Sequence, residues 1–373
     1  MSSIPVNTPL LNLKSKEYLN QCIDEGWISS EGEFVSKFEI AFSSYVEREF
    51  GVAVMNGTAA LEIAVKALDL KPGDEVIIPT FCIISCAAAI VRNNLVPVLV
   101  DCDPYTFNST AIQIEEKITP KTKAIMVVHT YGLPAEMDEI IKLANNYELK
   151  IIEDAAEMIG QTYKNRKCGS FGDISIVSFY PNKMITTGEG GMILTDDPTL
   201  RDKCAYYRNL CFMSERRFYH EELGWNFRMS NLQAALGLAQ LEQIDEYIQK
   251  KHLIGKIYTE NLLELEDVFQ LPIHKTNYAQ NIYWVYSLVL KNQSIQLKDM
   301  IAHLSQRKIG TRPFFWPMHE QPVFEKMGYF HNERYPNSEY IARNGFYLPS
   351  GLGITEEEIK LVCETLKKCL KEF

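Results

Sequence analysis

The sequence of 373 residues lacks any apolar run that reaches the ~18 residues needed to cross a membrane. Its first residues also lack the basic start and apolar core of a secretory signal. Basic residues are in the minority, with 38 Lys and Arg against 48 Asp and Glu, which gives a net charge of -10. This balance argues against a general nucleic-acid binder, because phosphate contacts need a basic face. We expect a protein that binds neither membranes nor nucleic acid.

The nine cysteines form no CxxC pair, and their number is odd. The sequence therefore indicates neither a disulfide framework nor a zinc ribbon. Free thiols suit a reducing compartment, so we expect a cytoplasmic protein without a structural metal. A hydrophobic share of 46% and a charged share of 23% predict a large buried core, and the length is comfortable for two domains.

Between about residues 50 and 195, short runs rich in Val and Ile alternate with segments of helical spacing. Runs such as DEVIIPT, AIMVVHT and LKIIED are apolar on both faces, which is typical of parallel strands covered by helices. The chain then turns helical, returns to an alternating strand in NIYWVYSLVL and closes on an amphipathic helix. We predict an α/β protein, with a large domain of mostly parallel mixed sheet in residues 1–240 and a smaller α+β domain in residues 241–373.

One lysine, Lys183, lies in SFYPNKMITTGEGGMILTDD (residues 178–197), a stretch that reads as strand, glycine-bearing loop and strand. A phosphate-binding P-loop needs its glycines before the lysine and a helix after it. Here the glycines follow the lysine and the chain re-enters a strand, so a P-loop is excluded. Two interpretations stay open for Lys183, a solvated surface charge and a nucleophilic amine.

Two other stretches carry polar side chains where a parallel sheet binds ligands. Asp154 ends the strand in IIEDAAEMIG, and open α/β sheets bind ligands at the carboxyl ends of their strands. Its carboxylate could cap a following helix or could pair with a buried cation such as a protonated pyridine nitrogen. Gly57 and Thr58 in MNGTAAL open a helix, where N–H groups and a hydroxyl could hold an anion. Ser178 offers a second hydroxyl.

An anion site, a strand-end carboxylate and a lysine in a later loop are the three groups that pyridoxal phosphate requires. The phosphate needs the anion site, and the ring nitrogen needs a carboxylate to stay protonated. The aldehyde needs a lysine amine for its Schiff base. The combination favours an enzyme that uses pyridoxal 5'-phosphate.

Ordered motifs extend this interpretation over nearly the whole chain, and they are GWISSEGEFVSKFE, NGTAAL, GDEVIIPTF, HTYG, EDAAE, GSFGDISIVSFYPNK, TTGEGGM, WNFRMSNLQAALGLAQLE and RPFFWPMH. In these motifs the chain resembles the DegT/DnrJ/EryC1/StrS family of pyridoxal phosphate-dependent aminotransferases, which have the aspartate aminotransferase-like (type I) fold. Within the family it is most similar to the GDP-perosamine synthase group. The resemblance implies transfer of an amino group from L-glutamate to the keto group of a nucleotide-linked 4-keto-6-deoxy sugar, for surface polysaccharide biosynthesis.

The resemblance also assigns cofactor residues. It implies that Lys183 forms the Schiff base and acts as acid and base, and that Asp154 pairs with the pyridine nitrogen. Glu157 matches a position near the ring hydroxyl. Asn226 matches an asparagine that reaches the phosphate from a second subunit, which implies a homodimer with shared active sites. The phosphate ligands that the resemblance implies are Gly57, Thr58 and Ser178.

Departures from the family pattern lie beside the expected substrate. Ile83 stands where many relatives stack an aromatic ring on the cofactor, although an aliphatic side chain can still pack there. Tyr180 and Pro181 replace Phe-Gly of the perosamine enzymes. Five residues are substrate candidates that could equally be packed or surface polar groups; they are His129, Tyr131, Ser30, Arg312 and His319.

Three alternatives compete with the sugar aminotransferase. The same transamination could act on a small phosphorylated ketone, such as a molecule similar to dihydroxyacetone phosphate. A pyridoxal phosphate-dependent sugar 3-dehydratase would carry histidine in place of Lys183, so the lysine argues against it. A non-catalytic binding protein would be expected to lose some of the cofactor residues, and none is lost.

Overall fold

The computed structural model describes residues 3–213, 215–291 and 294–373. Its larger sheet has seven strands in the order β1-β9-β8-β5-β4-β2-β3. The strands are β1 (Phe50–Val54), β2 (Glu75–Pro79), β3 (Val96–Val100), β4 (Thr122–Val128), β5 (Lys150–Asp154), β8 (Ile174–Ser178) and β9 (Gly191–Thr195). Strands β3, β2, β4, β5 and β8 run parallel, while β9 runs antiparallel to both β8 and β1. The predicted mostly parallel mixed sheet is confirmed.

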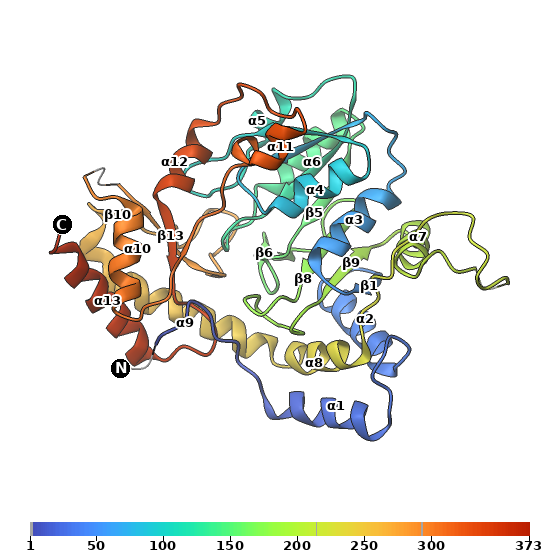
Figure 1. Cartoon of the computed structure of the whole chain (residues 1–373), viewed down its shortest axis with the longest axis horizontal. Helices are drawn as coiled ribbons and strands as arrows, with labels where there is room; N and C mark the ends of the chain where they lie inside the picture. Colours follow the sequence, from blue (N-terminus) through green and yellow to red (C-terminus); the bar gives the residue numbers. More distant parts are fainter. Residues whose placement is uncertain (1–2, 214, 292–293) are drawn as a thin grey trace.

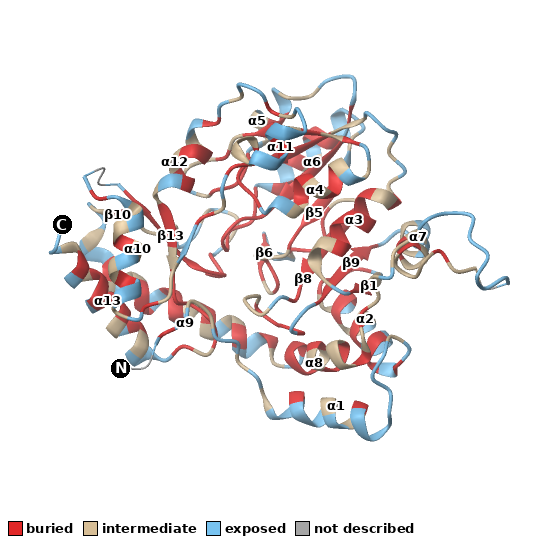
Figure 2. Cartoon of the chain, in the orientation of Figure 1, coloured by how far each residue is buried: buried red, intermediate tan, exposed pale blue. Residues whose placement is uncertain are grey.

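Helices cover both faces of this sheet (Figure 1). On one face lie α3 (Gly57–Ala67), α4 (Ile84–Arg92) and α7 (Pro198–Arg208), where α3 and α4 bury mainly small and aliphatic side chains and α7 buries Cys204 and Tyr207. On the other lie α2 (Glu33–Tyr45), α5 (Ala111–Glu115), α6 (Met137–Asn146) and α8 (Asn231–Leu241), while α1 (Leu13–Asp24) packs beside α8. Because both faces are covered, the central strands are buried along their length (Figure 2), which explains their continuous apolar runs. A short hairpin, β6 (Thr162–Tyr163) and β7 (Arg166–Lys167), follows β5.

The second sheet is antiparallel, with the order β10-β11-β13-β12. Its strands are β10 (Phe269–Gln270), β11 (Tyr286–Leu290), β12 (Arg312–Pro313) and β13 (Gly345–Leu348). Helices α9 (Ile244–Leu262), α10 (Leu297–Gln306) and α13 (Glu356–Leu370) pack around it, so the expected smaller α+β part follows the large one. The remaining elements are η1 (Leu263–Leu265), η2 (Met318–Glu320), α11 (Pro322–Lys326) and α12 (Pro336–Asn344).

The boundary at residue 240 stays a prediction, and two segments cross it. Ile4 bridges Ile309 beside the small sheet. Met318 and Phe324, far beyond residue 240, share a core with α3 and α4 of the large sheet. Among the described residues, no helix combines the length and the apolar character that a membrane span requires.

Candidate active site

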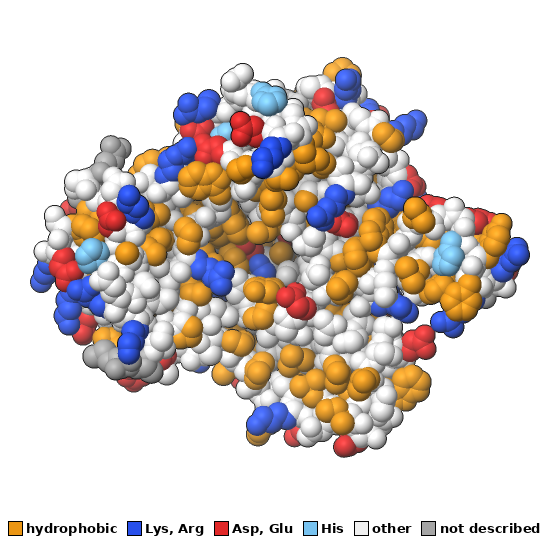
Figure 3. Space-filling view, in the orientation of Figure 1, with side chains coloured by type: hydrophobic (Ala, Val, Ile, Leu, Met, Phe, Trp, Pro, Cys, Tyr) orange, Lys and Arg blue, Asp and Glu red, His pale blue; other side chains and the backbone are white. Residues whose placement is uncertain are grey.

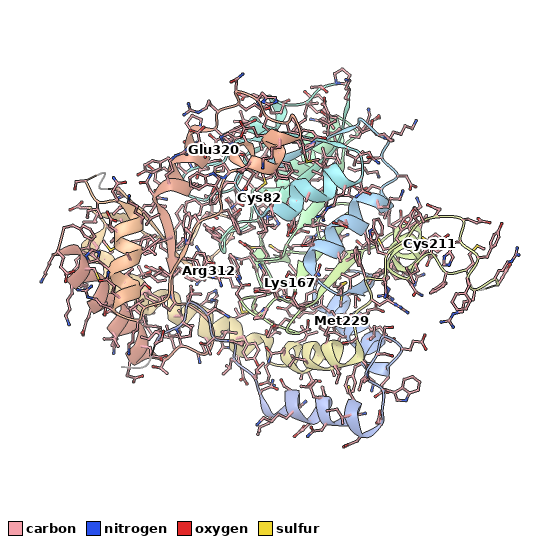
Figure 4. The ribbon with its side chains drawn as sticks, in the orientation of Figure 1. Cys82, Lys167, Cys211, Met229, Arg312 and Glu320 are labelled. Atoms are coloured by element: carbon pink, nitrogen blue, oxygen red, sulfur yellow. The ribbon has the colours of Figure 1, made fainter. Side chains whose placement is uncertain are left out.

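A cavity of about 410 Å³ lies between the large sheet and the small one and opens in the hollow at the middle of the face in Figure 3. Its walls come from the start of α3, the ends of β4, β5 and β8, and the loop that follows β8. Small-sheet residues close the other side, and Arg312 is labelled there in Figure 4. Ten of the residues singled out above line it, and they are Gly57, Thr58, Ile83, His129, Asp154, Glu157, Ser178, Tyr180, Lys183 and Arg312.

Lys183 lies in a tight turn after β8, where its backbone N–H donates to the carbonyl of Tyr180 at 2.9 Å. Its side chain is only 11% exposed, and Nζ lies 3.9 Å from Oε1 of Glu157. Nζ also lies 4.2 Å from the centre of the Trp284 ring. Burial lowers the pKa of Lys183, and the nearby carboxylates of Glu157 and Asp154 oppose the shift. The side chain is therefore not a solvated surface charge. A larger share of its amine is in the neutral, nucleophilic form than in an exposed lysine.

Asp154 is the last residue of β5 and is 2% exposed. Its Oδ1 accepts from the N–H of Ala156 at 3.0 Å, and its Oδ2 accepts from the Cys86 thiol at 3.3 Å. Burial raises the pKa of Asp154, while these two donors and the nearby Lys183 lower it. The residues that follow form turns, so the helix-cap interpretation is wrong. A buried carboxylate facing a cavity suits a cationic partner.

Glu157 lies beside Lys183 on the cavity wall. Its Oε2 accepts from the backbone N–H of Tyr131 at 2.8 Å. Burial raises the pKa of Glu157 to about 8, against the attraction of Lys183, and the neighbouring Asp154 adds to the rise. Near neutral pH this side chain therefore carries a proton in much of the population, and it can donate a hydrogen bond to a ligand oxygen.

The opposite end of the cavity is built to hold an anion. The Asn56 side chain caps α3 by accepting from the N–H of Ala59 at 2.8 Å. A Cβ on Gly57 would lie only 3.0 Å from the Cβ of Ser178, so glycine permits the close approach of α3 to β8. Thr58 and Ser178 add hydroxyls to the N–H groups of the helix start, a combination that binds phosphate.

The residues present fit pyridoxal 5'-phosphate. The hydroxyl of Thr130 and the amide oxygen of Asn182 both belong to residues of the cavity wall, and neither atom has a hydrogen-bond partner among the described residues. Buried polar atoms without a partner are uncommon, so they indicate that a polar ligand completes the site. An anion cradle at one end and a buried amine and carboxylate at the other match the three groups that the cofactor requires.

Two expected residues line a second, adjoining cavity of about 310 Å³ that shares Asn56 and Glu189 with the first. They are Ser30 and Asn226, and the guanidinium of Arg228 donates to Oδ1 of Asn226 at 2.8 Å. Asn226 is exposed and is not on the wall of the larger cavity of its own chain. This position leaves it free to face a second subunit.

Three substrate candidates have their polar groups occupied within the protein. His129 accepts at Nδ1 from the N–H of Ala135 at 3.1 Å, so Nε2 donates to Glu153 at 3.0 Å. Tyr131 lies behind the cavity, with its hydroxyl accepting from the N–H of Phe315 at 3.1 Å. His319 lies away from the wall of the larger cavity.

The two nitrogens of the His319 ring contact Thr80 Oγ1 at 2.9 Å and Glu339 Oε1 at 3.2 Å. It therefore joins the loop after β2 to α12.

Sequence patterns missed two residues of this site. Ser85, in the first turn of α4, places its hydroxyl 2.8 Å from that of Thr58. Trp284 lies just before β11 of the small sheet, and its indole N–H donates to the carbonyl of Asn182 at 2.9 Å, which holds the ring beside Lys183. The alternation in NIYWVYSLVL predicts a strand. It does not indicate that the residues just before this strand contact the loop that carries Lys183.

Comparison with known proteins identifies the family. Residues 10–367 match the DegT/DnrJ/EryC1/StrS aminotransferase family. The GDP-perosamine synthase of Escherichia coli O157:H7 is 40% identical over 369 residues, which span 99% of both chains. The EpsN protein of Bacillus subtilis, whose name describes a pyridoxal phosphate-dependent aminotransferase, is 32% identical over 97% of this chain and 95% of its own.

Among solved structures, an aminotransferase from Psychrobacter cryohalolentis superposes with a TM-score of 0.91 at 26% identity, over 98% of both chains. This similarity confirms the aspartate aminotransferase-like fold, with its mostly parallel sheet and small antiparallel one. The chain therefore belongs to the DegT/DnrJ/EryC1/StrS aminotransferase family, and it is an aminotransferase that uses pyridoxal 5'-phosphate.

Proposed function

We propose that this enzyme moves an amino group from L-glutamate to the keto group of a nucleotide-linked 4-keto-6-deoxy sugar, in the cytoplasm, for polysaccharide biosynthesis. The observation that carries the proposal is the buried Lys183 amine at the wall of a cavity that also presents the Asp154 carboxylate. The similarity to a GDP-perosamine synthase over the whole chain supports the sugar substrate.

When bound, pyridoxal phosphate supplies an electron-accepting ring that stabilises negative charge at the reacting carbon and carries the amino group between the two substrates. Lys183 would hold the aldehyde carbon of the cofactor through its amine, and once the amine of the substrate has replaced it, the freed Nζ would accept a proton from the substrate carbon and return it. Its lowered pKa favours this role, because a neutral amine can accept that proton near neutral pH.

The surrounding residues would bind and orient the cofactor. The helix start at Gly57 and the hydroxyls of Thr58 and Ser178 hold the phosphate. Asp154 would pair with the ring nitrogen and would keep it protonated, since a buried carboxylate favours a neighbouring positive charge. Glu157 donates to the ring hydroxyl, consistent with its raised pKa.

Residues at the opening of the larger cavity are the candidates for contacts with the substrates. Ile83 is 42% exposed on the cavity wall, where it would pack against the cofactor ring, and Tyr180 on the same wall would be available to contact the acceptor. Arg312 is exposed at the small-domain side of the cavity, where its guanidinium suits a carboxylate of the donor or a phosphate of the acceptor. His129 lines the cavity, whereas Tyr131 and His319 do not. All three have their polar groups occupied within the protein, so they shape the site rather than bond the substrate.

The active enzyme is a homodimer in which Asn226 reaches the phosphate of the other subunit. Supporting this, Asn226 lines the adjoining open cavity, and large apolar side chains are exposed in the segments near it. Trp27 is 53% exposed and Ile28 is 51% exposed, immediately before Ser29 and Ser30 of that cavity. Exposed apolar surface of this kind marks an interface.

The proposal is tested in two half-reactions. Mixing the pyridoxal phosphate-loaded enzyme with L-glutamate should bleach the visible absorbance of the bound cofactor and release 2-oxoglutarate. The aminated enzyme is then offered GDP-, UDP- and dTDP-linked 4-keto-6-deoxyhexoses and, separately, dihydroxyacetone phosphate. The expected result is an amino sugar nucleotide detected by mass spectrometry. Amination of dihydroxyacetone phosphate alone would overturn the sugar assignment, and no bleaching would overturn glutamate as donor.

A further inference from the structure

Cys86 is a buried thiol directly behind the cavity wall. It lies in the first turns of α4, is 0% exposed and is not among the residues that line the cavity. Its Sγ lies 3.3 Å from Oδ2 of Asp154, within reach of a sulfur hydrogen bond. Hydrogen bonding with the neighbouring Cys82, then burial and the nearby Asp154, raise the pKa of Cys86 well above its usual value, so the group stays a thiol and can donate.

The two oxygens of Asp154 each have one donor. Oδ1 accepts from the backbone N–H of Ala156 at 3.0 Å, and Oδ2 accepts from Cys86. Because the two donors approach different oxygens, they fix the rotation of the carboxylate about its last bond. Hydrogen bonds to an ionised carboxylate also favour the charged form, which burial disfavours.

We propose that Cys86 is a positioning residue for the cofactor, whose thiol orients Asp154 toward the pyridine nitrogen and helps to keep the carboxylate ionised. This inference rests on the proposed role of Asp154 in pairing with that nitrogen. It gives α4 a role in setting the protonation of the cofactor's pyridine ring, in addition to its packing against the sheet.

The other titratable groups around Asp154 do not replace this donor. Lys183 favours the ionised carboxylate by charge alone, and His129 has its two ring nitrogens engaged by Ala135 and Glu153. Asp154 adds to the raised pKa of Glu157, so ionisation of both neighbouring carboxyl groups together is unfavourable. Cys82 directs its thiol to the carbonyl of Pro79 at 3.2 Å. Among the described side chains, the hydrogen bond to Asp154 therefore comes from Cys86.

Loss of the Cys86 hydrogen bond should change the basicity of Asp154 in a definite direction. A carboxylate that loses a hydrogen bond becomes a stronger base, so Asp154 draws the proton away from the pyridine nitrogen. The ring then withdraws fewer electrons from the lysine linkage, and that linkage holds its own proton to a higher pH. A thiol is a weak donor, so we expect an upward shift of about half a pH unit and an approximately fivefold fall in kcat.

The test uses the full-length enzyme loaded with pyridoxal phosphate. Cys86→Val fills the space without a donor, whereas Cys86→Ser keeps a donor. Cys204→Val is the matched control, because Cys204 is a thiol of α7 that is buried in the same core. Visible absorbance is titrated from about pH 5 to 9, and the ring nitrogen is followed by nitrogen-15 NMR with labelled cofactor.

The expected result is an upward shift of the absorbance transition in Cys86→Val, with a nitrogen signal that moves toward the unprotonated pyridine. Cys86→Ser and Cys204→Val should titrate like the wild type. Cys86→Ala provides the same comparison if the valine variant loses the cofactor. An unshifted Cys86→Val and Cys86→Ala, or equal shifts in Cys86→Ser and Cys86→Val, would overturn the inference. A wild-type protein that forms no lysine linkage would instead overturn the proposed function.

Discussion

The two adjoining cavities are built in opposite ways. In the larger one, the side chains of Lys183 and Glu157 are 11% and 9% exposed, and burial shifts the pKa of both toward the neutral form. In the smaller one, Asn226 and Glu189 are exposed, and the polar groups face outward. The first can perform covalent chemistry with groups of one chain, since desolvation sets their protonation. The second resembles half of a site, and we infer that another subunit completes it.

The largest effect should come from Lys183→Ala, which removes the nucleophile from the buried cavity. We expect kcat for release of 2-oxoglutarate from L-glutamate to fall by about four orders of magnitude, since both the Schiff base and the proton-transferring amine are lost. Lys251→Met is the matched control, because Lys251 is also buried but donates to the carbonyls of Trp284 and Ser350. If Lys183→Ala keeps more than about a tenth of the wild-type activity, the larger cavity is not the one that performs covalent chemistry, and the contrast between the two cavities fails.

Asp154→Asn should have the next largest effect. The amide cannot hold the pyridine nitrogen protonated, so we expect kcat to fall by about two to three orders of magnitude while the cofactor still attaches to Lys183. Stopped-flow absorbance of the glutamate half-reaction measures this step. Asp138→Asn is the control, because Asp138 pairs with Lys164 at the surface. Equal rates in the two variants would contradict the role of Asp154.

Asn226→Ala tests whether the smaller cavity serves a second subunit. Loss of a hydrogen bond to a charged phosphate should weaken cofactor binding by about tenfold to a hundredfold. The decisive measurement mixes Asn226→Ala subunits with Lys183→Ala subunits after reversible dissociation. If the site is shared, each mixed dimer regains one site with both residues intact, and activity rises above that of either parent. If Asn226 serves its own chain, mixing restores nothing.

The smallest effect should be a change in pH dependence. In the folded, cofactor-free protein the pKa of Glu157 is raised from 4.5 to about 8, so the folded state holds a proton that the unfolded chain has lost. This group therefore makes its largest contribution to stability below pH 4.5, and that contribution is lost as the pH rises toward 8. The Glu157→Gln variant has no titrating group at this position, so it should not lose this stability as the pH rises. Its free energy of unfolding, minus that of the wild type, should therefore increase between about pH 4.5 and pH 8. Urea titrations at several pH values measure it, and parallel curves would contradict the raised pKa.

Much of the larger cavity could be predicted from the sequence, because its residues lie at strand ends. Asp154 ends β5, Ser178 ends β8 and Gly57 begins the helix after β1. Parallel neighbouring strands bring such ends to one edge, so motifs far apart in the chain meet by topology. Lys183 follows from the same logic, since its turn leaves β8 at that edge.

The contacts across the cavity could not be predicted in this way. Trp284 reaches Lys183 only because β11 begins where the small sheet meets the lysine loop. The pairing of Cys86 with Asp154 depends on how closely the start of α4 approaches the end of β5, and sequence spacing does not encode that distance. Likewise, His319 appears in a motif that suggests a substrate contact, yet packing directs its ring to Thr80 and Glu339.

The most direct test of the central claim is to trap the cofactor on its lysine. The loaded enzyme is reduced with borohydride, digested and mapped by mass spectrometry. The structure leads us to expect a phosphopyridoxyl group on Lys183, whose amine meets the cavity. Lys251 is the informative alternative, since its pKa is lowered to about 7 but its amine is enclosed by two backbone carbonyls. Modification of Lys251, of a surface lysine, or of none at all would contradict the account.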